Sequence, residues 1–99
     1  MTYIFKSSGQ YLGFTSNDNI FSRDGVYLGW LEGENVWDSN GTFRGKLTKV
    51  GTNYYILKNE FIITPIPRIP KISPISPVSP IPQANILPII LPIGYQDGF

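Results

Sequence analysis

An internal repeat with a spacing of 16 residues constrains the fold more than any other feature of this sequence. The pairs Ile4-Phe5, Ile20-Phe21 and Val36-Trp37 open three successive segments, and a glycine follows four residues later in each, at positions 9, 25 and 41. An aromatic residue and a second glycine complete each segment: Tyr11, Tyr27 and Phe43, then Gly13, Gly29 and Gly45. Agreement of so many residue classes at one spacing indicates a true repeat.

Each segment predicts a β-hairpin, because β-branched and aromatic residues flank Ser8-Gly9, Asp24-Gly25 and Asn40-Gly41. Such dipeptides tolerate the positive φ of tight two-residue turns. With these dipeptides as loops, residue 4 faces 13 and residue 5 faces 12 in the first unit. This register predicts two faces. One carries Ile4, Ile20 and Val36 with Tyr11, Tyr27 and Phe43, and the other carries Phe5 with Leu12, Phe21 with Leu28 and Trp37 with Arg44.

A fourth, weaker unit follows after an insertion of two residues. Asn53-Tyr54-Tyr55 aligns with Asn19-Ile20-Phe21, and Lys58-Asn59 is the predicted turn, with Phe61 at the aromatic position. Ile63 stands where the other units have their closing glycine. We therefore expect this unit to end differently from the other three.

The predicted fold is all-β, because a lone hairpin is marginally stable and four hairpins must bury a shared face. The expected arrangement is four antiparallel hairpins about a pseudo-fourfold axis, like a small propeller with two-stranded blades. Over residues 2 to 64 this pattern resembles the bacterial 4-fold beta flower domain, which implies the same arrangement and carries no settled function. The MORN repeat is a weaker alternative, because Trp30 directly follows Gly29, where that repeat has one residue between them.

The chain changes character after Thr64, which divides it into a hairpin domain, residues 1–64, and an extended arm, residues 65–99. All nine prolines lie between positions 65 and 92. From Ser73 to Ile81 the pattern Ser-Pro-Ile/Val repeats every three residues, the period of a polyproline II helix, and gives one edge of Pro74, Pro77 and Pro80. Because its other residues are mainly aliphatic, we expect the arm to dock on the domain or on a neighbouring subunit, with Tyr95 and Phe99 as anchors. A disordered stalk is the alternative.

Composition argues against several function classes. The chain has no cysteine and no histidine, and its net charge is +1. We therefore expect no enzyme, no cofactor, no metal site and no nucleic-acid partner. The seven carboxylates mostly fall where turns and connections need them. The absence of a signal peptide or a long apolar run predicts a cytoplasmic protein without a membrane partner.

The remaining candidates for function are the aromatic residues and the arm. Phe21, Trp30 and Trp37 fall on one predicted face, which either completes a second layer of core or forms an open binding face. The sequence favours a structural or protein-interaction module whose arm mediates self-association or partner docking. A small module that binds carbohydrate or peptide on its aromatic face is the alternative function.

Overall fold

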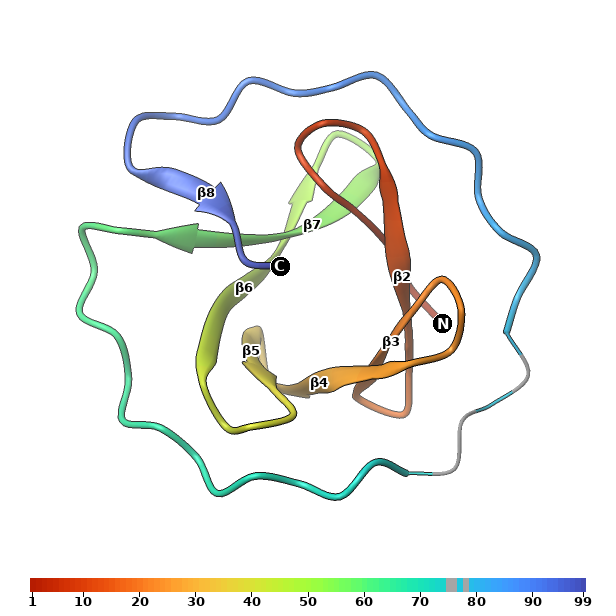
Figure 1. Cartoon of the computed structure of the whole chain (residues 1–99). Coiled ribbons are helices and arrows are strands. Elements are labelled where there is room, and N and C mark those ends of the chain that lie inside the picture. The colour runs from red at the N-terminus through yellow and green to blue at the C-terminus, as the bar shows by residue number, and fades with distance from the viewer. Residues whose placement is uncertain (75–76, 78) are drawn as a thin grey trace.

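The strands of the protein close into a single barrel (Figure 1). The computed structural model describes residues 1–74, 77 and 79–99. Strands β1 to β7 pair in sequence order as antiparallel neighbours, and a parallel pairing of β1 with β7 closes the barrel. A short eighth strand, β8, pairs with the end of β7. The strands are β1 (Tyr3–Phe5), β2 (Tyr11–Ser16), β3 (Asn19–Ser22), β4 (Tyr27–Glu32), β5 (Asn35–Asp38), β6 (Phe43–Val50), β7 (Asn53–Asn59) and β8 (Tyr95–Asp97).

The all-β class is confirmed, but the prediction of a propeller of separate hairpins is wrong. Each predicted hairpin is also hydrogen-bonded to the next one, through β2–β3, β4–β5 and β6–β7. An isolated two-stranded blade would leave unpaired backbone groups along both of its edges. Pairing between units, together with the β1–β7 contact, satisfies those groups in one closed mixed sheet.

The predicted two-residue turns are also wrong, because the loops contain three residues. In the first unit Lys6 N donates to Gln10 O at 2.9 Å and Gly9 N donates to Lys6 O at 2.8 Å, and the same pair of bonds recurs in the next two units. This is a type I turn followed by a residue of positive φ that forms a bulge, and Gly9 has φ 91°. Only the glycine needs the left-handed conformation, so Ser8 acts as an ordinary turn residue.

A second bulge, between Ile4 and Phe5 where β2 has the extra residue Leu12, keeps one part of the predicted register and reverses another, and it recurs in the next two units. Ile4 pairs with Gly13, Ile20 with Gly29 and Val36 with Gly45, as expected. Beyond the bulge, Phe5 pairs with Tyr11 and not with Leu12. One extra residue exchanges the faces of the strand. The aromatic rings therefore meet on the outside of the barrel, in the pairs Phe5–Tyr11, Phe21–Tyr27 and Trp37–Phe43.

The core cluster that draws on all four units is aliphatic. It is built on Ile4, Ile20, Val36 and Ile56, all almost fully buried, with Leu12, Leu28, Leu31, Leu47 and Phe99 packed against them. In the fourth unit Ile56 holds the core position, where the alignment predicted Tyr54. Ile56 lies 20 residues after Val36, so the insertion is four residues and not two. It adds two residue pairs to the β6–β7 hairpin, and the core position therefore lies two residues beyond Tyr54.

The fourth hairpin is completed by the C-terminus of the chain. β7 continues through Asn59 instead of turning at Lys58-Asn59, and it pairs with β8, with Asn59 opposite Tyr95 and Leu57 opposite Asp97. Gly98 N then donates to Ile56 O at 2.9 Å, so Gly98 supplies the closing glycine that Ile63 was predicted to replace. In effect, residues 60–94 stand in place of the turn of the fourth hairpin.

We call residues 60–94, which join β7 to β8, the belt, and its described residues lie round the outside of the barrel. Figure 1 shows the described stretches, 60–74 and 79–94, on the perimeter. The molecule is a flat disc with Cα extents of 37 × 35 × 17 Å.

Candidate functional site

The described residues of the belt present three edges, and one of them faces away from the barrel. Exposure follows a period of three over most of the belt, as expected for a polyproline II chain, with Arg68 and Lys71 as exposed members of the inward register. Pro65, Pro74, Pro77, Pro80, Gln83, Ile86 and Ile89 are half-buried against the barrel. We define the outward edge as the aliphatic residues at the opposite positions, which are 82–99% exposed: Ile63, Ile66, Ile69, Ile72, Ile81, Leu87, Ile90 and Ile93. Ile75, Ser76 and Val78 of the predicted pattern lie outside the described residues.

Backbone hydrogen bonds attach the belt to two of the hairpin turns. At the β5–β6 turn, Arg68 N donates to Gly41 O at 2.8 Å and Lys71 N to Ser39 O at 3.2 Å. At the β1–β2 turn, Ile86 N donates to Gly9 O and Ile89 N to Ser7 O, both at 2.8 Å. The donors are three residues apart at both turns, so one edge of the extended chain supplies all of them.

Two cations of the belt cover the tryptophans. The Arg68 guanidinium lies 4.6 Å from the ring centre of Trp37, and the Lys71 ammonium lies 4.5 Å from that of Trp30. Both indoles are almost fully buried. Cation–π contacts of this kind attract a charge to the ring face without neutralising it. The tryptophans of the full chain therefore form part of the contact between barrel and belt.

Glu32 links the two partners of that contact. Its carboxylate accepts a hydrogen bond from Trp30 Nε1 at 2.9 Å and pairs with Arg68 at 3.2 Å. These hydrogen bonds, first from Trp30 and then from Arg68, favour the charged form and lower the pKa of Glu32. In contrast, Trp37 Nε1 is buried without a hydrogen-bond partner in the described part of the chain.

On the opposite side of the disc the belt packs through aliphatic residues. Ile86, Ile89 and Leu91 contact a cluster of Phe5, Tyr11, Tyr55 and Leu57. Asn85 Oδ1 accepts the backbone N–H of Tyr11 at 3.1 Å, a group that the bulge leaves without a strand partner. Burial in this layer raises the pKa of the Tyr11 hydroxyl.

The C-terminus fixes the end of the belt. Asp97 accepts hydrogen bonds from Ser7 N at 2.8 Å and Ser7 Oγ at 2.7 Å. Arg44 donates to Gly98 O, stacks at 4.5 Å on the Phe99 ring and forms an ion pair with Asp38 at 3.2 Å. Phe99 therefore closes one part of the aliphatic core.

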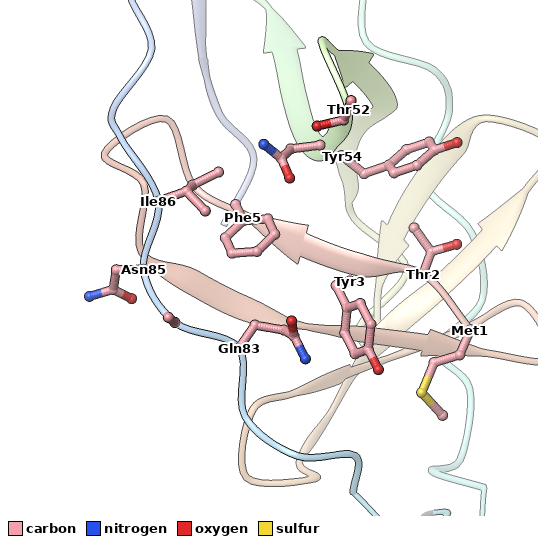
Figure 2. Close-up of a pocket in the computed structure, with 11 residues that line it drawn as sticks. Met1, Thr2, Tyr3, Phe5, Thr52, Tyr54, Gln83, Asn85 and Ile86 are labelled. Atoms are coloured by element: carbon pink, nitrogen blue, oxygen red, sulfur yellow. The ribbon is translucent and has the colours of Figure 1, made fainter.

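A pocket of about 480 Å³ lies between the belt and the start of the barrel (Figure 2). Tyr3, Phe5 and Tyr54 supply rings, and Thr52, Asn53, Gln83 and Asn85 supply neutral polar groups. Figure 2 shows the Gln83 amide directed toward the Tyr3 ring. The lining contains no charged side chain among the described residues. Its chemistry suits a neutral ligand with both apolar and hydroxylated surfaces.

The structure brings some of the predicted site residues together. Trp30 and Trp37 lie side by side in one cluster with Phe43, and Phe21 stacks on Phe14 in the same buried outer layer. Pro74, Pro77 and Pro80 face the barrel, Tyr95 is exposed on β8, and Phe99 lies against the core. Sequence reasoning identified an Ile/Val edge only over residues 73–81 and expected the aliphatic residues of the arm to be covered. The same period of three runs from Ile63 to Ile93.

Other kinds of site find no support in the described residues. No group of three or more acidic side chains lies close enough there to hold a metal ion. Among the same residues, no helix is both long and apolar enough to cross a membrane.

Comparison with known proteins yields a family assignment. Neither the curated proteins nor the solved structures include a significant match to the chain. The family model described as "4-fold beta flower protein" matches residues 1–94, which covers the barrel and the whole belt. This confirms the resemblance seen over residues 2–64 and extends it: the chain belongs to the 4-fold beta flower family.

Proposed function

We propose that this protein is a non-catalytic interaction module, and that the outward edge of its belt is the docking surface for another copy or for a partner protein. The observation that carries the proposal is the exposure of this edge, whose eight described residues are 82–99% accessible. A long row of exposed aliphatic side chains is an unusual concentration of apolar surface, and such concentrations mark interaction sites.

The folding of the barrel does not account for these residues. The half-buried prolines, together with Ile86 and Ile89, already fasten the belt to the barrel. A polar residue at every outward position would keep the inner contacts and improve solubility. The aliphatic edge therefore has a use outside the single folded chain.

The belt is also suited to binding because it is held in place beforehand. An extended polyproline II chain has little conformational entropy left to lose, and this one is attached at two turns and at β8. A partner that buries the edge orders almost nothing further. Extended proline-rich segments are recognised in this way in other proteins.

The test replaces part of the edge and measures its accessibility to an apolar probe. The variant Ile66→Thr, Ile69→Thr, Ile90→Thr is compared with the control Val26→Thr, Val50→Thr, whose valines are also exposed but lie on the barrel. We expect the edge variant to keep its circular dichroism and unfolding midpoint, and to lose several-fold more bis-ANS fluorescence and phenyl-column retention than the control. Equal effects of the two variants, or unfolding of the edge variant, contradict the proposal.

A second candidate function is the binding of a small neutral ligand, such as a saccharide, in the pocket of Figure 2. The pocket favours it because the hydroxyls of Tyr3 and Tyr54 make no hydrogen bond to any described residue, and aromatic rings stack on sugar faces. Calorimetry with maltose and cellobiose tests it. Binding that is lost in Tyr3→Ala and kept in Tyr95→Ala, a tyrosine of similar exposure on β8, supports this function. If neither sugar gives a binding heat, or if Tyr3→Ala and Tyr95→Ala lose binding equally, this second function is excluded.

A further inference from the structure

We propose that further copies of the same chain occupy the outward edge, side by side, and that each disc contacts several neighbours so that the assembly is open-ended. This inference rests on the proposed function and adds the identity of the partner and the geometry of the contact.

The lack of charge on the outward edge is compatible with other copies of the same chain as partners. Between residues 61 and 94 the only charged residues are Arg68 and Lys71, and both cover indole rings of the barrel. No position of the outward edge carries a charge, and the net charge of the whole chain is +1. Two belts can therefore approach without like-charge repulsion, and a protein so close to neutral resists association weakly.

The regular spacing of side chains on the outward edge allows the edges of two copies to interdigitate. Aliphatic side chains at every third position of an extended chain stand roughly 9 Å apart. A second belt has the same spacing, so its side chains can lie between those of the first. A twofold axis between two belts keeps this fit along the whole contact, as in other symmetric interfaces of identical chains.

The available area excludes a single pairwise contact as the stable state. One fully exposed Ile or Leu side chain offers roughly 100 Å² of apolar surface, so the eight described residues offer roughly 800 Å² in total. A neighbouring disc touches only part of a convex perimeter, so one contact buries less than the roughly 800 Å² that a stable interface needs from each partner. Burial of most of the edge thus requires several neighbours at once.

The direction of growth follows from where apolar residues are exposed. Outside the belt, the large apolar residues exposed among those described are few and mostly lie on different elements: Met1, Tyr3, Val26, Val50 and Tyr95. Within the belt, Phe61 and Ile62 are exposed next to the first residue of the outward edge. The perimeter of the disc is therefore the main apolar surface. Contacts along the perimeter extend an assembly in the plane of the disc, through many weak contacts that form cooperatively.

Sedimentation velocity of the full chain over a wide range of concentration tests this inference, with electron microscopy of the same samples. We expect the average mass to rise continuously past that of a dimer, and planar arrays to form at high concentration. The Ile66, Ile69, Ile90 threonine variant should stay monomeric. A one-sided variant, Ile63→Thr, Ile66→Thr, Ile69→Thr, should stop growth at small oligomers, because it removes the contacts of one part of the perimeter only.

A wild-type chain that stays monomeric, or that forms one closed oligomer of fixed mass, overturns the inference. Growth that is unchanged in both variants overturns it as well. The bis-ANS comparison separates the two proposals. If the wild type is monomeric but its edge still binds the dye, the self-assembly proposal is wrong and the docking-surface proposal stands. If the wild type is monomeric and its edge does not bind the dye, both proposals are wrong.

Discussion

The contact between the belt and the β5–β6 turn can be tested with one glycine. A Cβ atom added at Gly41 would overlap the backbone carbonyl of Arg68, and a backbone neighbour of this kind cannot rotate away. Gly33 is the matched control, because it also has a positive φ, 63°, but nothing lies within 4 Å of the position of its Cβ. Asparagine is the best replacement at both sites, since it tolerates this conformation and Asn17 adopts it in this chain with φ 51°.

The size of the effect follows from the bonds that the overlap breaks. Seating the belt at this turn makes two backbone hydrogen bonds, to Gly41 O and Ser39 O. Each contributes about 0.5–1.5 kcal/mol net, so Gly41→Asn should lower the free energy of unfolding by about 1–3 kcal/mol. Gly33→Asn carries the cost of a positive φ but no overlap, so it should stay within about 1 kcal/mol of the wild type.

Urea unfolding followed by tryptophan fluorescence measures both values, and the native spectrum gives an independent signal. Displacement of the belt removes Arg68 from the Trp37 ring, so the emission of native Gly41→Asn should shift toward that of a solvated indole. Equal destabilisation by Gly41→Asn and Gly33→Asn would refute the seating of the belt on the turn.

Three further predictions follow from the contacts of the belt and the C-terminus. The pKa of Glu32 in the folded protein lies below its ordinary value of 4.5. The contribution of this carboxylate to the free energy of unfolding is therefore complete above pH 4.5 and is lost as the pH falls through the lowered pKa. Glu32→Gln should remove this part of the pH dependence of the unfolding midpoint. Trp30→Phe should destabilise more than Trp37→Phe in urea unfolding, because only the Trp30 indole N–H has a partner, and the reverse order would contradict the assigned hydrogen bond. Phe99→Ala should cost about 1–3 kcal/mol by the same assay, less than a fully buried phenylalanine, and no loss would mean that the C-terminus does not close the core.

The sequence predicts those parts of this fold that depend on residues close together in the chain. The hairpins and the pairing of Ile4 with Gly13 follow from residues fewer than ten positions apart, and the repeat itself has a spacing of only 16. The loop length was mispredicted because Ser8-Gly9 suits both a two-residue turn and the last two positions of a three-residue loop. That single residue decides which face Tyr11 occupies, so a local ambiguity became an error in the predicted layers.

The contacts that hold the belt could not be predicted, because they join distant parts of the chain. Ile56 and its closing glycine, Gly98, are separated by the whole belt, and periodicity within a hairpin cannot locate such a partner. Arg68 and Trp37 meet only when the belt passes the third unit, so the sequence left open whether the aromatic face is a second layer of core or an exposed binding face. In the structure both tryptophans of this face are buried. The outward edge, in contrast, can be read from the sequence, because its period of three involves only residues close together in the chain.

The length of the belt gives a physical reason for its proline content. A circle through the outermost Cα atoms of a disc of 37 × 35 Å has a perimeter of about 113 Å. The 35 residues from 60 to 94 span about 108 Å as a polyproline II chain at about 3.1 Å per residue, but only about 52 Å as an α-helix. Only a chain kept extended can leave β7, pass the hairpin turns and return to β8. Prolines keep it extended without a neighbouring strand, and the period of three that they impose turns every third residue outward, so the requirement that closes the fourth hairpin also creates the outward edge.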